Sequence, residues 1–415
     1  MVFYAWGEPV MVFLMVGTSE VNRLLAILVE KHKGTKKGKL IAIVAISLTL
    51  ATLAVFKYGG LLHLPFKPSL PIGISFYTFQ IIAYMVEVYK GNTKAQKSSL
   101  KFLMYISLFP QLIAGPIVRY NLVEQQISGT RPTNVTNISY GITRFTIGLA
   151  KKVLLANQLG AAARTVLDGN VVMSVSGAWL GVFLFALQIY YDFSGYSDMA
   201  IGLGRIFGFS FPENFNYPYI SQSISEFWRR WHMTLGGFFR DYVYIPLGGG
   251  RRMVFRNLLI TWFLTGLWHG ASWNFALWGV YFGVLIIIEK AFLLKVTEKV
   301  PALIKIPFTL FFVVFGWALF YYTDFERMWG FIKSLLALNS MPLTDIVTTN
   351  LLYDKIAVII IALLFCMPIY RYIERAIERM RALQYIVPVV NVAIVFLCVI
   401  MLVGDTHNPF LYYRF

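Results

Sequence analysis

The chain has few cysteines, few charged residues and few histidines for its 415 residues. Its two cysteines, Cys366 and Cys398, lie inside apolar runs, which excludes a disulfide framework and a cysteine-rich metal site. Charged residues make up 14% of the chain, whereas soluble domains carry about 25%. The sequence also lacks a Walker A loop, an H-E-x-x-H zinc motif and a G-x-S-x-G nucleophile elbow. We therefore expect neither a bound metal nor a separate soluble enzyme domain.

Apolar sequence dominates instead, with 58% hydrophobic residues, 17% aromatic residues and a mean hydropathy of +0.64. We expect an all-α polytopic integral membrane protein with roughly ten spans, each close to the ~20 residues that cross the hydrocarbon, in a single domain over residues 1–415. The clear spans are 40–57, 72–89, 140–159, 175–191, 272–289, 306–322, 355–370 and 385–404. Shorter or Gly- and Pro-broken runs, typical of tilted or re-entrant pieces, are 1–29, 102–118, 199–211 and 255–268.

The net charge of +17 does not indicate nucleic acid here, because Lys and Arg concentrate in loops between apolar runs. By the positive-inside rule these loops face the cytoplasm. Their basic groups also suit anionic lipid headgroups. The first residues, "MVFYAWGEPVMVFLMVG", lack a basic region and a cleavage site, so we expect a membrane helix rather than a removable signal peptide.

Two histidines lie in unusual settings, whereas His32 is expected in a Lys-rich loop, His63 beside an outer loop and His407 near the C-terminus. His269 lies in "TGLWHGASWNFALWG", deep in an apolar run, with glycines that let a backbone or a substrate approach closely. His232 lies in "FWRRWHMTL", and the spacing predicts Trp228 one helical turn before it. An ionisable group at such depth marks a functional site by default. The alternative is a neutral histidine bonded to a helix carbonyl.

Acids and hydroxyls gather in "QIYYDFSGYSDMA", which follows a long apolar run and predicts a polar cavity inside the membrane. Asp192 and Asp198 have an alternative, structural role, in which they pair with Arg205, Arg229, Arg230 or Arg240. Two local ion pairs are also expected, Glu226 with Arg230 and Arg240 with Asp241. The run "GLGRIFG" follows no strand, so it predicts close helix packing rather than a dinucleotide site.

Four segments occur in order and carry a family resemblance: "LFPQLIAGPIVRY", "YYDFSGYSDMAIGLGRIFGF", "PENFNYPYISQSISEFWRRWHMTLGGFFRDYVYIPLGG" and "TGLWHGASWNFALWG". Together they resemble the membrane-bound O-acyltransferase (MBOAT) family, in its alginate O-acetyltransferase-like bacterial branch. The resemblance runs from about residue 70 to "PFLYYRF". It departs at the N-terminus, where relatives carry more apolar sequence before "FYAWGEP", so the first span is expected to be shortened.

The resemblance implies a helical barrel around a central tunnel, entered by an acyl thioester donor from the cytoplasm and by a hydroxyl acceptor from the other side. Carried over residue by residue, it makes His269 the key histidine and His232 the second polar position. A histidine with a pKa near 6.5 suits the removal of a hydroxyl proton, so His269 is the expected general base. The expected substrate- and donor-binding residues are Trp228, Arg229, Arg230, Trp231, Trp268, Asn274, Asp192, Tyr196 and Asp198.

These features predict a bacterial cytoplasmic-membrane O-acetyltransferase that acts on a cell-surface or exported polysaccharide. No cofactor is expected to stay bound, since the donor, acetyl-CoA or an acyl carrier protein, is a substrate. The resemblance also implies an extracytoplasmic partner acyltransferase. One alternative is a D-alanyl transferase for teichoic acid that uses a carrier-protein thioester. Another is a proton-coupled transporter, since buried acids, histidines and broken helices also build carriers. A third is a non-catalytic membrane scaffold.

Overall fold

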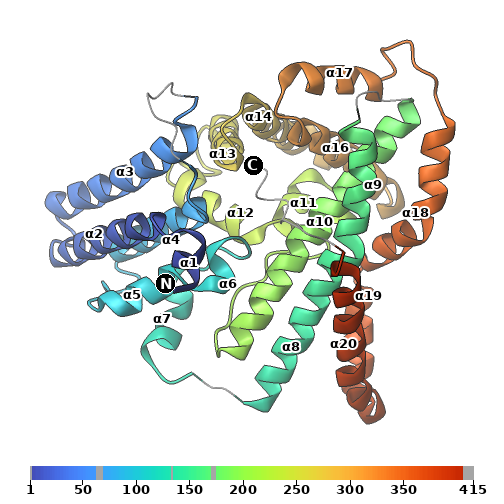
Figure 1. Ribbon diagram of the computed structural model, residues 1–415. Helices are drawn as coiled ribbons and strands as arrows, with labels where there is room; N and C mark the ends of the chain where they lie inside the picture. The colour runs from blue at the N-terminus through green and yellow to red at the C-terminus, as the bar shows by residue number, and fades with distance from the viewer. Residues whose placement is uncertain (1, 62–68, 132–133, 170–173, 405–415) are drawn as a thin grey trace. The chain divides into compact units, whose positions relative to one another are not determined.

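The computed structural model describes residues 2–61, 69–131, 134–169 and 174–404 (Figure 1). In these ranges the chain is helical and contains no β-strand, which confirms the predicted all-α class. His63 and His407 lie outside the described residues. The single domain, the barrel, its tunnel and the re-entrant pieces stay predictions.

The helices group into two compact units, each described by itself. The first comprises Met1–Ile142, Ala200–Glu213 and Gly237–Pro246, and the second comprises Thr143–Met199, Asn214–Gly236 and Leu247–Phe415.

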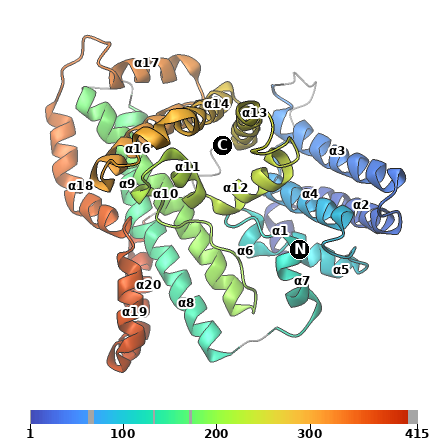
Figure 2. The same cartoon turned by 180° about the vertical axis from the view of Figure 1, so that it is seen from behind.

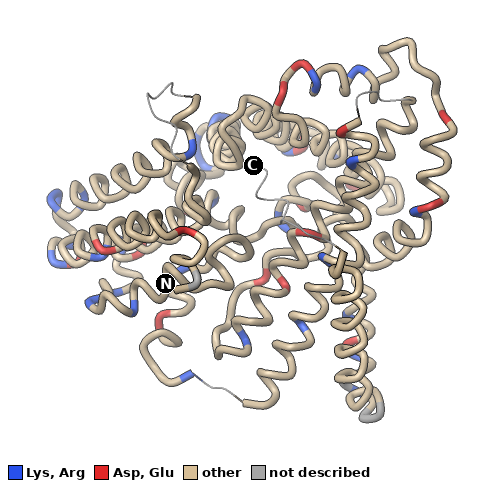
Figure 3. The backbone as a smooth tube through the Cα atoms, in the orientation of Figure 1, with Lys and Arg blue, Asp and Glu red and all other residues tan. Residues whose placement is uncertain are grey.

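Seven helices begin the chain in the first unit: α1 (Val2–Gly7), α2 (Met11–Lys31), α3 (Lys36–Tyr58), α4 (Ile74–Lys90), α5 (Ser99–Ile106), α6 (Phe109–Leu112) and α7 (Tyr120–Ser128). A short π-helical turn, η3 (Arg240–Tyr244), also belongs to this unit. Helices α2 and α3 pack against each other, and basic residues gather at the turn between them (Figure 3). Thr35 begins α3, because its hydroxyl accepts a hydrogen bond from the Gly38 backbone N–H at 3.1 Å.

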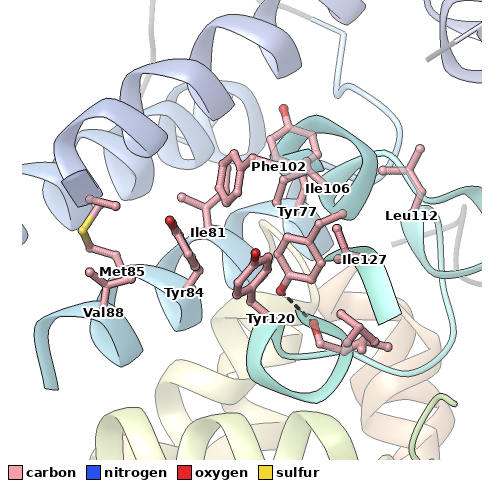
Figure 4. Packing of buried hydrophobic residues seen from close by; sticks show 14 of the residues in the cluster. Tyr77, Ile81, Tyr84, Met85, Val88, Phe102, Ile106, Leu112, Tyr120 and Ile127 are labelled. Atoms are coloured by element: carbon pink, nitrogen blue, oxygen red, sulfur yellow. Dashed lines mark hydrogen bonds between the residues drawn. The ribbon is translucent and has the colours of Figure 1, made fainter. Parts of the chain in front are cut away.

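The core of this unit forms around α4, which is buried along nearly its whole length. Tyr84 of α4 contacts Phe102 of α5 and Tyr120 of α7, with ring centroids 4.7 and 5.1 Å apart (Figure 4). The Tyr84 hydroxyl accepts a hydrogen bond from the Gln96 backbone N–H at 2.7 Å. Tyr84 therefore supplies both packing area and a polar group that finds a partner.

The remaining elements are α8 (Val135–Ala150), η1 (Lys151–Ala156), α9 (Asn157–Leu167), α10 (Val175–Ile206), η2 (Pro218–Ile220), α11 (Ile224–Arg230), α12 (Met233–Phe239), α13 (Val254–His269), α14 (Trp273–Ile288), η4 (Glu289–Leu293), α15 (Leu294–Val296), α16 (Ala302–Tyr321), α17 (Phe325–Leu335), α18 (Ile346–Phe365), α19 (Ile369–Arg379) and α20 (Arg381–Leu402). Helix α14 packs against both α13 and α16. Helices α14 and α16 lie side by side in both ribbon views (Figure 2).

Glycines allow α13 and α14 to touch through their backbones. A Cβ atom on Gly266 would lie 2.2 Å from the Phe275 carbonyl oxygen, and one on Gly279 would lie 2.3 Å from the Trp262 carbonyl oxygen. A Cβ on Gly270 would lie 2.2 Å from the Phe275 ring. The glycines around His269 therefore admit neighbouring parts of the protein, as the sequence allowed.

Six helices of the described chain are long and apolar enough to cross a membrane: 11–31, 36–58, 273–296, 302–321, 346–365 and 383–402. The chain is thus a multi-pass membrane protein. The predicted span 140–159 is divided into α8, η1 and α9 by a π-helical turn. Residues 175–206 form one uninterrupted helix, α10, although we expected the polar stretch within it to separate two pieces.

Close helix packing of the "GLGRIFG" run is confirmed. A Cβ atom on Gly141 of α8 would lie 2.6 Å from the Gly202 carbonyl oxygen of α10, and one on Gly204 would lie 2.6 Å from the Phe211 ring. Cys366 and Cys398 are free and buried, as their apolar settings predicted.

Candidate functional site

His232 lies at the turn between α11 and α12, with only 2% of its surface exposed. Helix α11 ends at Arg230, and His232 adopts a left-handed backbone conformation with φ of 44°. The predicted helical spacing of Trp228 and His232 is therefore wrong, because the helix stops before it reaches the histidine. A non-glycine residue in this region costs about 1–3 kcal/mol, and such strain clusters at functional sites. Its ring contacts Phe193 and Trp268.

The segment before η2 holds this turn in place. The Asn214 carbonyl accepts a hydrogen bond from the Met233 N–H at 2.9 Å, and the Asn216 N–H donates to the Arg230 carbonyl at 2.9 Å. The Asn214 side-chain oxygen lies 3.0 Å from Nδ1 of His232. Asn214 was not predicted as a site residue, although its motif, "PENFNYP", was noticed for its resemblance to the family.

His269 is the last residue of α13 and is 8% exposed. Aromatic rings surround it: the centroids of Trp268, Trp278 and Phe320 lie 4.9, 5.0 and 5.2 Å from that of His269. Trp278 comes from α14 and Phe320 from α16, so three helices enclose the imidazole. Such a setting keeps water away from the ring, which suits acyl transfer from a hydrolysable donor.

Trp268 joins the two histidines, because its indole contacts both imidazoles, with centroids 6.1 Å from His232 and 4.9 Å from His269. The folding of α11 to α13 thus brings together three residues, His232, Trp268 and His269, of which the first and last are 37 positions apart in the sequence. Burial lowers the pKa of His232, which lies outside the six candidate spans, to about 3. His232 is therefore neutral at physiological pH.

Trp228 and Trp231 belong to an aromatic cluster next to the histidines. Trp228 contacts Trp262, Trp278 and Phe282, and its buried indole N–H has no hydrogen-bond partner among the described residues. Trp231 contacts Trp317, with centroids 4.9 Å apart. Both tryptophans therefore belong to the aromatic cluster that contacts His269 through Trp278, whereas their contact with a substrate stays a prediction.

Asn274 is buried in the first turn of α14. Its amide nitrogen donates to the Leu319 carbonyl at 3.3 Å, while its side-chain oxygen has no partner among the described residues. An unpaired buried carbonyl is a costly feature. Asn274 therefore has an acceptor available for a ligand or water, while its role in substrate binding stays a prediction.

The arginines predicted for donor binding differ in exposure. Arg229 is exposed, whereas Arg230 pairs with Glu226 at 2.7 Å and also donates to the Asn216 carbonyl. The predicted pair of Arg240 with Asp241 is confirmed at 2.7 Å, and Asp241 also accepts from Arg119. Arg229 and Arg240 are therefore the exposed arginines of this group.

Asp192 and Asp198 lie buried on α10 and form ion pairs with α8 and η1. Lys152 pairs with Asp192, and Asp198 accepts from Arg144 and Lys151 at 2.7 and 2.6 Å. None of these three cations was among the predicted partners. These pairs favour the structural role of both acids, while Tyr196, between them on α10, is half-buried. The sequence did contain a signal of this pairing, because cations inside the apolar run 140–159 need buried acids as partners.

Glu289 is a further buried acid that the sequence analysis missed. It is 2% exposed at the start of η4, and its two carboxylate oxygens accept from the backbone N–H groups of Ile224 and Ser225, each at 2.8 Å. These N–H groups begin α11, so a residue after α14 holds the helix that leads to His232. The sequence signal for this role was the position of Glu289 at the end of the apolar run 272–289, where a buried acid needs a partner.

Replacing Glu289 with alanine is expected to destabilise the protein by about 1–3 kcal/mol, because a buried and a part-buried N–H group lose their acceptor. Glu289→Gln, which keeps one acceptor oxygen, should lose less. Thermal unfolding of the purified protein in detergent would measure both. Glu298→Ala is the matched control, since Glu298 is exposed on the same segment. Equal stability of the Glu289→Ala and control proteins would contradict this role.

The described residues include no group of three or more His, Cys, Asp or Glu side chains that could hold a metal. The arrangement instead offers two buried imidazoles, neighbouring indole rings and buried side-chain amides. Such groups can accept a hydroxyl proton, orient a hydroxyl and exclude water.

Comparisons with known proteins agree with the resemblance found in the motifs. The MBOAT, membrane-bound O-acyltransferase, family profile matches residues 23–329. The probable alginate O-acetylase AlgI of Pseudomonas aeruginosa is 37% identical over 385 residues, which cover 88% of this chain and 73% of the relative. A peptidoglycan O-acetyltransferase of Helicobacter pylori is 32% identical, with 82% and 73% covered. A teichoic acid D-alanyltransferase of Bacillus subtilis is 29% identical, with 60% and 68% covered. The chain belongs to the membrane-bound O-acyltransferase family.

Proposed function

We propose that this protein is an O-acetyltransferase that moves an acetyl group from a cytoplasmic thioester across the membrane towards hydroxyls of a cell-surface or exported polysaccharide. The observation that carries the proposal is the pair of buried imidazoles, His232 and His269, in contact with one indole, Trp268. The names of the alginate and peptidoglycan relatives support a polysaccharide acceptor. The bacterial cytoplasmic membrane is the proposed location.

The proposed reaction transfers the acetyl group directly. The acceptor hydroxyl oxygen forms a bond to the thioester carbonyl carbon, the carbon–sulfur bond breaks, and an ester and a free thiol result. His269 takes the hydroxyl proton as general base and returns it to the leaving thiolate, so protons balance. His232 orients the acceptor or the carbonyl. The aromatic rings around His269 keep out water that would hydrolyse the thioester.

The donor would approach exposed arginines in the last turn of α11 and just before α13. Arg229, Arg251 and Arg252 are exposed and belong to the second unit. Their positive charge suits the phosphates of coenzyme A or an acidic acyl carrier protein. The tryptophans and Asn274 would line the path of the acyl group. A separate extracytoplasmic acyltransferase would complete delivery to the polymer.

The first experiment would reconstitute the purified protein in lipid vesicles with radiolabelled acetyl-CoA and an oligosaccharide acceptor. Donor turnover or acetylated sugar is the expected result. Parallel reactions would use an acetylated carrier protein and a D-alanylated carrier protein as donors. Preference for the D-alanyl donor would overturn the acetyl assignment in favour of the D-alanyl transferase, whose similarity to this chain is lower. Solute uptake without any acyl donor would instead favour a transporter.

A further inference from the structure

Asn214 contacts His232 through both its backbone and its side chain. Its backbone carbonyl accepts from the N–H of Met233 at 2.9 Å, so the residue after the histidine is fixed to it. Its side-chain oxygen faces Nδ1 of the His232 ring at 3.0 Å, and both groups are buried. A buried contact of this kind determines which ring nitrogen carries the proton.

The hydrogen bonds around Asn214 identify the atom that faces His232 as oxygen. The Thr234 backbone N–H, which can only donate, points at the same atom at 3.4 Å, and the Thr234 hydroxyl donates to it at 2.9 Å. The other amide atom, Nδ2, lies 3.2 Å from the Ser197 hydroxyl and donates to it. Because a side-chain carbonyl oxygen can only accept, Nδ1 of His232 must be the donor.

The opposite nitrogen of His232 then carries the lone pair. Nε2 is buried and has no hydrogen-bond partner among the described residues. Burial keeps the ring neutral at physiological pH, as the lowered pKa indicates. A neutral imidazole with its proton on Nδ1 can only accept at Nε2.

We propose that Asn214 is a positioning residue that holds His232 with its proton on Nδ1, so that Nε2 accepts a hydrogen bond from the acceptor hydroxyl. This inference rests on the proposed acetyl transfer and narrows the role of His232. A ring held in this way cannot donate to the thioester carbonyl, so polarisation of that carbonyl belongs to other groups. The left-handed backbone at His232 fits the same role, because it aims the ring at Asn214 instead of continuing α11.

The tautomer can be read directly from the wild-type protein by solid-state ¹⁵N NMR in lipid vesicles at neutral pH. Labelled histidine gives five side chains, and the His232 signals are assigned by their loss in His232→Gln. We expect a protonated Nδ1 and an unprotonated Nε2. A proton on Nε2 of wild-type His232 would overturn the proposal, whatever the variants do.

Asn214→Leu removes the acceptor and keeps the backbone contact, whereas Asn214→Asp keeps an acceptor oxygen. We expect the leucine variant to move the proton towards Nε2, to lower kcat with the saccharide by about 10²-fold or more, and to leave KM for acetyl-CoA within about twofold, because donor contacts are not changed. The aspartate variant should keep the wild-type tautomer and recover part of the rate. Asn391→Leu, which removes a half-buried asparagine bond to Thr143, is the matched control.

Two outcomes separate this inference from the proposed function. An unchanged tautomer and rate in Asn214→Leu would overturn the positioning role even if wild-type turnover is high. Absence of wild-type turnover with every donor, together with the expected Nδ1–H spectrum, would overturn the acetyl-transfer function while supporting the hold of Asn214 on His232.

Discussion

His269→Ala is expected to lower the rate of acetyl transfer by about 10²- to 10⁴-fold, the usual contribution of a positioned general base. The ring lies at the end of α13 among Trp268, Trp278 and Phe320, where no other described imidazole except His232 comes near the same indole. The loss should appear in kcat, because the donor is expected to be held mainly by other groups. Radiolabelled acetyl transfer in vesicles would measure it.

His32→Ala is the control for the His269 variant, since His32 lies in the turn between α2 and α3. His269→Gln tests whether a polar side chain of similar length suffices, and it should be nearly as impaired as alanine because an amide cannot take a proton. Size-exclusion profiles would show whether each variant is folded. Full turnover by a folded His269→Ala protein would make the histidine structural and the proposed mechanism wrong.

Lys152→Met is expected to destabilise the protein by about 3–5 kcal/mol, the usual result of removing one partner of a buried ion pair. Asp192, the partner of Lys152, is 1% exposed on α10, and its carboxylate would stay in the interior without its lysine. Thermal inactivation of the purified protein in detergent, followed by fluorescence-detected size exclusion, would measure the loss.

The double variant Lys152→Met with Asp192→Asn separates charge from packing. Removing both charges should recover most of the stability, because a neutral pair of similar shape avoids the cost of an unpaired buried ion. Lys355→Met is a control, since Lys355 pairs with an exposed acid, Asp354, and surface pairs contribute about 0–1 kcal/mol. If the double variant is as unstable as Lys152→Met, the lysine stem rather than its charge is what matters.

Much of the architecture could be predicted from the sequence, because long apolar runs have few alternatives to membrane helices. The helices 36–58, 302–321 and 383–402 lie close to the predicted spans. The glycines of "GLGRIFG" were recognised as packing positions because no strand precedes them. The predicted helix boundaries were wrong where polar residues interrupt an apolar run. Helix α10 continues through its acids because they pair with cations of α8 and η1.

The histidines of the candidate site could be predicted because ionisable residues are rare in apolar sequence, but their surroundings could not. His232 was assigned to the helix of Trp228, whereas the chain leaves that helix at Arg230. Nothing local in the sequence signals a left-handed histidine, which is stabilised by Asn214, 18 residues earlier. The contact of Glu289 with α11 could not be predicted for the same reason, since its partners lie more than 60 residues before it. Contacts between distant segments decide these details.

The backbone contact between α13 and α14 has a consequence for which acyl groups can enter. With Gly266 against the Phe275 carbonyl and Gly279 against the Trp262 carbonyl, the two helices cannot move closer, and sliding one along the other would drive a carbonyl into a Cα atom. The helix pair α13 and α14, which carries His269, therefore has a fixed spacing. Tolerance for an acyl chain longer than acetyl must come from rotation or replacement of the surrounding rings, such as Phe320 on α16, and not from helix movement.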